Sequence, residues 1–272
     1  MKRTPLVVFT DLDGTLLDEA AYSFEPARPA LDALAASGVP VVLCTSKTRA
    51  ETERWRRALD NTHPFVVENG AAVLVPCGYF GPDMSYDRQD AAYGLLEFGR
   101  PYREVRLALQ AIRAATGLPL RGFGDMPVEE IAARCGFSLE DAALAARREY
   151  DEPFVGADPA SLGAVVREAA ALGLRIVAGG RFLHLAGGGD KGLAVKTLRR
   201  LFDRDGTKVR AIGLGDGPND EPMLRQVDVP VLVLRRDGRH AEIPDLPGLV
   251  IAPYAGPDGW REAVLELLRS AP

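Results

Sequence analysis

Short apolar runs that end in polar residues recur along the chain and predict buried strands. The first run, residues 6–10, is β-branched and aromatic, and Asp11 and Asp13 follow it directly. A second run, residues 39–44, and a third, residues 209–215, also end in polar residues. Segments with helical periodicity lie between these runs. The alternation predicts an α/β fold whose core is a doubly wound, mainly parallel, Rossmann-like sheet.

The spacing of the polar groups indicates an inserted second domain. Thr45 and Lys191 lie much further apart than one helix and one strand require. We therefore predict a core of residues 1–81 and 188–272 with an inserted α/β cap of residues 82–187. The expected helices are residues 26–37, 49–59, 101–116, 127–135, 138–148, 159–172, 191–201 and 260–269, and the further strands are 65–67, 154–155, 175–178, 182–185, 231–234 and 249–251.

The composition is that of an ordinary globular chain and limits the classes of function. Of 272 residues, 47% are hydrophobic and 26% charged, with a net charge of −5. This charge argues against a nucleic-acid binder, and an anionic substrate would need local cations. No apolar run approaches the ~18 residues of a membrane-spanning helix, and Asp11 comes too early for a secretion signal. Three widely spaced cysteines, Cys44, Cys77 and Cys135, fit a reducing cytoplasm better than a disulfide frame.

Asp11 and Asp13 are suited to phosphoryl transfer. One carboxylate can attack phosphorus, and the other can donate and accept a proton, when a divalent cation holds both beside the phosphate. Open α/β sheets bind ligands at the carboxyl ends of their strands, which is where these two residues are expected. The alternatives are a turn with a capping Asp, a calcium loop, or the metal site of a sugar transferase.

Further polar groups stand at strand or helix boundaries. Thr45 is expected near a helix N-terminus, which is a ready anion site, although a capping role alone is the alternative. Lys191 opens a helical segment after glycines, where a solvated loop lysine is the alternative. Asp216 and Asp220 follow a strand and could also be turn acids. Their joint occurrence at such boundaries favours one shared site.

Asp-x-Asp, Thr, Lys and Gly-Asp-x-x-Asn-Asp, in this order, resemble the four motifs of the haloacid dehalogenase superfamily of phosphohydrolases. The resemblance implies that Asp11 becomes an aspartyl phosphate while Asp13 acts as acid and then as base, and that Thr45 and Lys191 bind the phosphoryl oxygens. The implied catalytic residues are Asp11, Asp13, Thr45 and Lys191. The implied Mg²⁺ ligands are Asp11, the backbone carbonyl of Asp13, and Asp216, with Asp220 nearby.

Six further segments resemble the mannosyl-3-phosphoglycerate phosphatase family: residues 46–49, 68–70, 101–106, 148–152, 179–184 and 189–192. The resemblance implies hydrolysis of a sugar glycerate phosphate to mannosylglycerate, a compatible solute. The expected substrate-binding residues are Ser46, Lys47, Asn69, Arg181, His184 and Asn219. Arg181 and His184 are expected to grip the glycerate or sugar part from the cap, and a surface pair on the cap is the alternative.

Other readings remain open at this point. Glucosyl-3-phosphoglycerate or another sugar phosphate is an alternative substrate. A phosphomutase would use the same acids but return the phosphoryl group to the substrate, so free phosphate distinguishes the two. A non-enzymatic sugar-phosphate-binding protein is expected to lack one of the acids, and this chain lacks none. We expect a small phosphorylated sugar as ligand, no nucleic-acid or membrane partner, and a monomer or homodimer.

Overall fold

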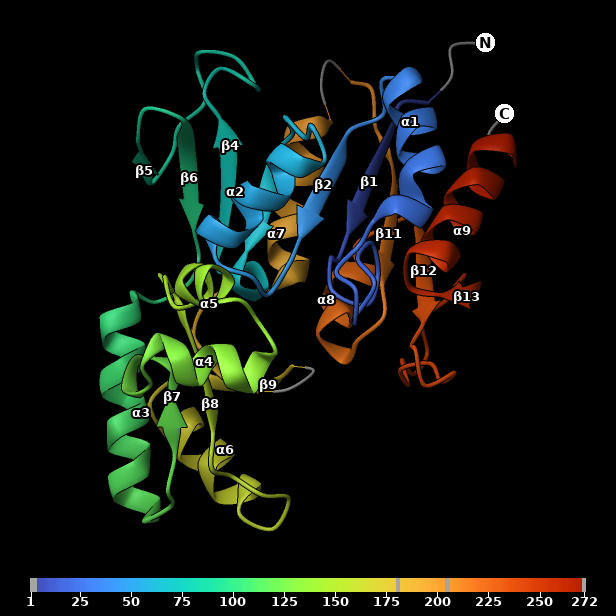
Figure 1. The fold of residues 1–272 in the computed structure, drawn as a ribbon. Coiled ribbons are helices and arrows are strands. Elements are labelled where there is room, and N and C mark those ends of the chain that lie inside the picture. The colour runs from blue at the N-terminus through green and yellow to red at the C-terminus, as the bar shows by residue number, and fades with distance from the viewer. Residues whose placement is uncertain (1–3, 180–181, 204–205, 271–272) are drawn as a thin grey trace.

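The computed structural model describes residues 4–179, 182–203 and 206–270, and it has two sheets (Figure 1). The strands of the larger sheet are β1 (Leu6–Thr10), β2 (Val41–Cys44), β3 (Phe65–Val67), β4 (Ala72–Pro76), β5 (Arg88–Gln89), β6 (Tyr93–Glu97), β11 (Arg210–Gly215), β12 (Val229–Leu234) and β13 (Val250–Ala255). Their order is β13-β12-β11-β1-β2-β3-β4-β6-β5. The pairs from β13 to β3 are parallel, and β4, β6 and β5 extend the sheet in antiparallel fashion.

Helices cover both faces of this sheet. They are α1 (Arg28–Ala36), α2 (Arg49–Ala58), α7 (Lys191–Phe202), α8 (Glu221–Leu224) and α9 (Gly256–Ser270), with 3-10 turns η1 (Glu25–Ala27), η2 (Glu68–Gly70) and η4 (Pro218–Asp220). Val8 packs in one core with Leu34 of α1 and Trp260 of α9, whereas Val7 packs in another with Val195 of α7. Successive residues of β1 thus face opposite cores, which confirms the doubly wound, mainly parallel α/β fold.

A second unit lies below the large sheet in Figure 1 and has its own antiparallel sheet. Its strands are β7 (Arg121–Gly122), β8 (Asp151–Val155), β9 (Arg175–Ala178) and β10 (Leu183–Ala186), in the order β7-β8-β10-β9, and its helices are α3 (Tyr102–Thr116), α4 (Val128–Cys135), α5 (Leu139–Ala145) and α6 (Leu162–Ala171), with the 3-10 turn η3 (Phe123–Asp125). Ile112 of α3 and Val165 of α6 pack against Phe154 of β8. This separate core is what an inserted α/β cap requires.

The start of the insert differs from the expectation at residue 82. Residues 88–97 form β5 and β6, which pair with β4 and so belong to the large sheet. Apolar contacts between β6 and β4 explain this pairing. Leu95 of β6 is buried opposite Leu74, and Leu96 lies opposite Val73. The Gly- and Pro-containing stretch at 78–83 is therefore part of a loop within the core. We propose that the cap begins after Glu97 and ends near Gly187.

Several element ends also differ from the sequence expectation. The helix expected to reach residue 148 ends at Ala145, and Arg148 instead contacts the core. The helix expected from residue 159 begins at Leu162, because the Asp158 carboxylate accepts from the Ser161 N–H in a preceding turn. Helix α9 begins at Gly256, before the expected residue 260. Among the described helices, none has the length and apolar character needed to cross a bilayer.

Trp260→Ala is expected to destabilise the core strongly. The ring is fully buried, and its Nε1–H donates to Thr10 Oγ1 at 2.9 Å at the end of β1. Removing it leaves a cavity and takes one of two partners from the Thr10 hydroxyl, which still donates to the Asp11 carbonyl at 2.8 Å, so we expect the free energy of unfolding to fall by about 3–5 kcal/mol. Urea unfolding followed by circular dichroism measures this loss. Leu107→Ala on α3, where the side chain is 56% exposed, is the control and should change stability by less than about 0.5 kcal/mol. Equal losses would contradict the expectation.

Candidate active site

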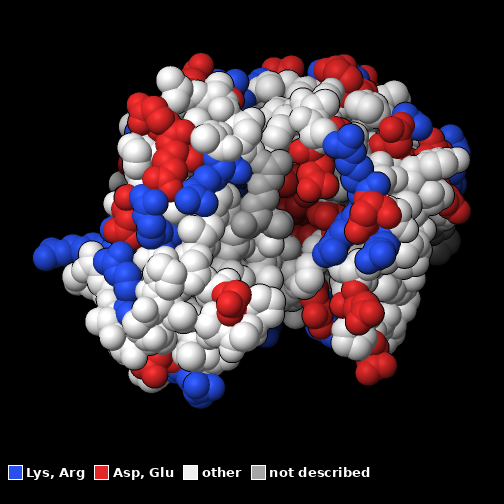
Figure 2. Space-filling model, turned by 60° about the horizontal axis from the view of Figure 1, so that its bottom comes forward, with Lys and Arg blue, Asp and Glu red and all other residues white. Residues whose placement is uncertain are grey.

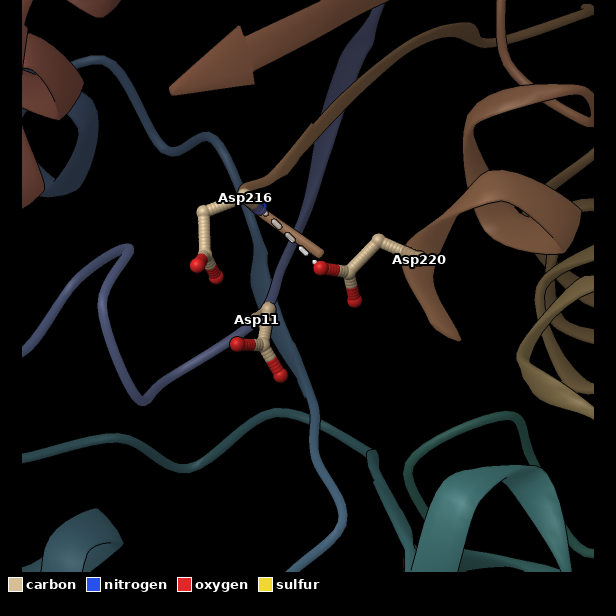
Figure 3. Close-up of side chains that lie close together, drawn as sticks. All are labelled: Asp11, Asp216 and Asp220. Atoms are coloured by element: carbon tan, nitrogen blue, oxygen red, sulfur yellow. Dashed lines mark hydrogen bonds between the residues drawn. The ribbon is translucent and has the colours of Figure 1, made fainter. Parts of the chain in front are cut away.

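The acids expected to act together meet at one edge of the large sheet. β1 and β11 are parallel neighbours, with Thr10 opposite Leu214, and the Asp11 N–H donates to the Leu214 carbonyl at 2.9 Å. Asp11 and Asp216 therefore leave adjacent strands at the same carboxyl edge. Asp216 Oδ1 accepts a hydrogen bond from Thr15 Oγ1 at 3.0 Å, which fixes the carboxylate toward the loop after β1. Figure 3 shows Asp11 and Asp216 beside Asp220.

Gly14 allows this close approach. Its φ is +76°, and a Cβ at this position would lie 2.9 Å from Asp216 Oδ2. A larger residue would be strained in the backbone and would push the Asp216 carboxylate away. The glycine after the Asp-x-Asp pair thus shapes the loop so that it accommodates the third acid.

Lys191 links the acids electrostatically. It is the first residue of α7, only 1% exposed, and its Nζ lies 2.6 Å from both Asp11 Oδ1 and Asp220 Oδ1. The other oxygen of Asp220 accepts from the backbone N–H groups of Asp216 and Gly217, each at 3.0 Å. Although burial opposes the charge, Asp11 and Asp220 raise the pKa of Lys191 above its usual range. The alternative of a solvated loop lysine is therefore wrong.

Gly70 brings another loop against the lysine. Its φ is +90°, and an added Cβ would lie 2.0 Å from the carbonyl carbon of Asp190 and 2.3 Å from the Lys191 nitrogen. The 3-10 turn after β3 is thus packed directly on the start of α7, where the Asp190 side chain caps the helix by accepting from the Leu193 N–H. This contact fixes the position from which the Lys191 side chain reaches the acids.

Three acids form a group that can hold a cation. Asp11, Asp216 and Asp220 each offer a carboxylate oxygen, and these atoms all lie within 4.8 Å of one another. Burial and then Asp220 raise the pKa of Asp216 to about 7, and burial raises that of Asp11 despite the opposing effect of Lys191. Such crowded carboxylates gain from a bound cation, and an all-oxygen donor set suits Mg²⁺.

Asp13 points to a different partner. Its Oδ1 lies 2.9 Å from Lys47 Nζ, and its carboxylate is not part of the three-acid group. The expected metal contact of Asp13 is through its backbone carbonyl, which stays a prediction. Lys47 is almost fully buried, and Asp13 and Glu51 raise its pKa although burial opposes this. The ion pair with Lys47 holds the Asp13 carboxylate, the acid/base candidate, next to the cap.

Thr45 does not lie at the N-terminus of α2, whose capping residue is Thr48. Thr48 caps α2 in a box with Glu51: the Thr48 hydroxyl accepts from the Glu51 N–H, and the Glu51 carboxylate accepts from the Thr48 N–H. Thr45 lies earlier, fully buried, with its hydroxyl accepting from the Lys47 N–H at 3.1 Å. The alternative that Thr45 or Ser46 serves only as the cap is therefore excluded.

Buried charges join the cap to these loops. The Glu68 carboxylate accepts from the backbone N–H groups of residues 149, 150 and 151, at 2.8–2.9 Å. Asp151 is fully buried and pairs with Arg148 at 2.8 Å and with His184 Nδ1 at 2.9 Å. Arg148 also donates to the Ser46 carbonyl at 2.8 Å. Although burial opposes it, Arg148 and then His184 hold the pKa of Asp151 below its usual value.

Of the expected substrate-binding residues, Asn69 and Asn219 lie where the cap meets the loop of the acids, and His184 lies buried in the cap. Asn69 donates to Asp151 at 3.3 Å and accepts from Asn219 at 3.4 Å, so it connects the cap junction with the loop of the acids. His184 is only 6% exposed, so it is not a surface residue of the cap. Arg181 lies outside the described residues, and the expectation that it grips the substrate stays a prediction.

Asp151, Arg148 and Arg235 were not among the expected site residues. Arg148 lies in the connection between α5 and β8, and Asp151 is the first residue of β8, where a charge pair resembles a solvated surface pair. Arg235 directly follows a predicted strand, the same signal that marks Asp11, and its Nε donates to the Asp216 carbonyl at 3.1 Å.

Figure 2 shows the charged side chains at the surface of the molecule. Acidic side chains fill a hollow between the two units, and Lys and Arg side chains lie on its rim.

A cavity of about 290 Å³ lies beside Lys47. Residues of α2 line one side and the turn between α4 and α5 lines the other, with Tyr22 and Phe137 contributing aromatic rings. The Lys47 ammonium lies 5.2 Å from the centre of the Tyr22 ring and 5.9 Å from that of Phe137. The cavity therefore combines ring faces with charged groups, as sugar-sized polar ligands require.

Comparisons with known proteins agree with this geometry. Residues 8–82 match the haloacid dehalogenase-like hydrolase family. A glucosyl-3-phosphoglycerate/mannosyl-3-phosphoglycerate phosphatase of Methanococcoides burtonii is 40% identical over 263 residues, covering 96% of this chain and 97% of that protein. A protein of the same name from Persephonella marina is 41% identical over 265 residues, covering 97% of each. The chain belongs to the haloacid dehalogenase superfamily.

The fold and the enzyme class follow from this membership. A haloacid dehalogenase-like hydrolase from Bacteroides thetaiotaomicron superposes with a TM-score of 0.67 at 18% identity, covering 97% of this chain and 100% of the other. The predicted superfamily and fold are confirmed. As a member of this superfamily whose relatives are phosphatases, the chain is a phosphoric monoester hydrolase.

Mg²⁺ binding to this phosphatase is expected to weaken as the pH falls below about 7. An ordinary aspartate has a pKa near 4, whereas burial and Asp220 raise that of Asp216 to about 7. At pH 6 the metal must displace a proton, so affinity should fall by about tenfold per pH unit below 7. Calorimetry in buffers of different ionisation heat measures the affinity and the protons released. Equal affinity at pH 6 and pH 8 without proton release would contradict this.

Proposed function

We propose that the chain is a Mg²⁺-dependent phosphatase that acts on mannosyl-3-phosphoglycerate, with glucosyl-3-phosphoglycerate as the second candidate, and releases the glycosylglycerate and phosphate. The observation that carries the proposal is the buried Lys191 held between Asp11 and Asp220, next to Asp216. The substrate class is supported by the two relatives at 40% and 41% identity, whose names carry both sugars.

Asp11 is proposed as the nucleophile. One of its oxygens forms a bond to phosphorus while the bond to the leaving alkoxide breaks, giving an aspartyl phosphate. Lys191 holds the attacking Asp11 carboxylate in place and offsets the negative charge of the phosphoryl oxygens that approach it. Mg²⁺, held by Asp11, Asp216 and the backbone carbonyl of Asp13, supplies the remaining charge neutralisation when bound. Asp220 holds Lys191 in position from the other side.

Asp13 is proposed as the acid and base. It gives its proton to the leaving alkoxide and then takes a proton from the water that attacks the aspartyl phosphate, which frees Asp11 and inorganic phosphate. Its carboxylate is 36% exposed and lies against Lys47, at the boundary with the cap. This is where a leaving group held by the cap must lie. The ion pair with Lys47, at 2.9 Å, holds the Asp13 carboxylate in this position.

The remaining site residues are proposed to hold the substrate. Thr45 and the Ser46–Lys47 backbone are placed to bind phosphoryl oxygens, because the Thr45 hydroxyl lies in the loop directly after β2 at the same sheet edge. Asn69 and Asn219 are in contact and face the same junction. His184 acts from the cap, oriented by Asp151. The cavity beside Lys47 is proposed to take the glycosyl group against Tyr22 and Phe137.

The cellular setting is part of the proposal. Cys44 and Cys77 are thiols in the structure, which supports a reducing cytoplasm as the location. A small phosphorylated sugar is the expected partner, and the choice between monomer and homodimer stays a prediction.

Asp11→Asn is expected to abolish turnover while the fold is kept. The amide preserves size but cannot form the aspartyl phosphate, so kcat should fall by at least about 10³-fold. Phosphate release and thermal unfolding are measured together. Asp32→Asn, an exposed change on α1, is the matched control and should keep wild-type activity. Activity of Asp11→Asn within about tenfold of wild type would refute the covalent mechanism.

A panel of phosphate esters tests the substrate. We expect kcat/KM for mannosyl- and glucosyl-3-phosphoglycerate to exceed that for hexose phosphates by about tenfold or more, because only the former engage both sugar- and carboxylate-binding groups. Free phosphate must appear in step with glycosylglycerate, since a phosphomutase would isomerise the ester without releasing phosphate. A wild-type enzyme that prefers hexose phosphates would defeat the substrate assignment, leaving the phosphatase class intact.

A further inference from the structure

We propose that Arg235 binds the carboxylate of the glycerate part of the substrate. The inference rests on the proposed function, because a glycosyl-3-phosphoglycerate carries a carboxylate and a phosphate at the two ends of its glycerate. The phosphate has partners in the acid-bound metal site and Lys191. The carboxylate needs a separate cationic group within reach of the same centre.

Arg235 lies where such a group is required. It is the first residue after β12, and β12 is the parallel neighbour of β11, with Leu232 opposite Gly215. It therefore leaves the sheet at the same carboxyl edge as Asp216. Its Nε donates to the Asp216 backbone carbonyl at 3.1 Å and lies 3.9 Å from Asp216 Oδ2. The guanidinium is thus directly beside the acids that surround the reacting phosphorus.

The two Nη groups of the Arg235 guanidinium are available to bind a ligand. Its Nη1 and Nη2 groups make no hydrogen bond to the parts of the chain that the structure describes, and the side chain is 35% exposed. The other cations of the site are occupied: Lys191 by Asp11 and Asp220, and Lys47 by Asp13. Arg148 is buried against Asp151. Arg235 therefore has free donors in the paired geometry that matches a carboxylate.

The backbone holds this side chain in place. The Arg235 N–H donates to the Arg239 carbonyl at 3.0 Å, and the Arg235 carbonyl accepts from the Gly238 N–H at 2.9 Å. Because Nε is also fixed on the Asp216 carbonyl, the direction of the two Nη groups is set before any ligand binds. Such preorganisation reduces the conformational entropy lost when a carboxylate binds.

A purely structural role is the competing explanation. Arg235 also lowers the negative potential around Asp216, so its loss could weaken metal binding alone. That effect would lower the hydrolysis of every ester alike. A carboxylate contact would lower only the binding of ligands that carry one, so the two explanations predict different results.

The experiment compares two small phosphates that differ at one group. D-glycerate 3-phosphate and glycerol 3-phosphate are measured as competitive inhibitors of p-nitrophenyl phosphate hydrolysis at saturating Mg²⁺, in wild type, Arg235→Ala and Arg235→Lys. In wild type the carboxylate ligand should bind about tenfold or more tightly, the scale of a charge-assisted pair. In Arg235→Ala this preference should vanish, and because both inhibitors are compared within one variant, the ratio of their inhibition constants is read independently of any change in kcat/KM for p-nitrophenyl phosphate. Arg235→Lys should restore part of it.

Arg239→Ala is the matched control. Arg239 is an exposed arginine of the same turn, so its removal changes the net charge equally and should leave the preference for the carboxylate intact. An unchanged preference in Arg235→Ala, equal losses for both inhibitors, or the same loss in Arg239→Ala would overturn the inference. The inhibitor comparison does not need turnover of a glycosyl ester. A wild type that fails the ester panel but shows the carboxylate preference would thus refute the proposed substrate and keep the inference.

Discussion

The site depends on one buried ammonium. Lys191 is almost completely removed from water, and two carboxylates at 2.6 Å offset the cost of burying its charge. Those carboxylates come from the end of β1 and from the turn after β11, while the lysine opens α7. Three segments that are distant in sequence are therefore held in one arrangement. Loss of either acid leaves the buried Lys191 ammonium with one carboxylate partner. The position of the Asp11 side chain and the local fold are therefore coupled.

A second buried charge group ties the cap to the same loops. Asp151 binds Arg148 and His184 within the cap. Arg148 connects to the core at the Ser46 carbonyl, and Asn69 of the core connects to Asp151. Because the Ser46 loop follows β2 beside the acids, any rotation of the cap must disturb the loop that is proposed to bind phosphate. Hydrogen bonds therefore connect the cap directly to that loop, and apolar contacts such as that of Tyr22 with Phe137 lie beside them.

The sequence predicted what local patterns can show. Asp11 and Asp216 follow apolar runs, and strands that are parallel must deliver their following residues to one edge. The buried charge group around Asp151, which joins the cap to the core, could not be predicted. It arises from the pairing of β8 with β10, which sets Asp151 opposite Ala186. β6 was missed since its pairing with β4 is decided by cross-strand contacts such as Leu74 with Leu95. Arg235 follows the same rule as Asp11, but a charged turn resembles solvated surface.

Charge at short range explains how an acidic protein can bind an anion. The net charge is −5, and three carboxylates converge at the reacting centre. Burial raises the pKa of Asp11, and burial with Asp220 brings that of Asp216 to about 7, so a cation beside these acids would favour their ionised forms. The proposed divalent cation would offset the repulsion between these carboxylates and a dianionic phosphate. The acids that repel a phosphate are thus the same acids that offer oxygen ligands to the cation proposed to bind it.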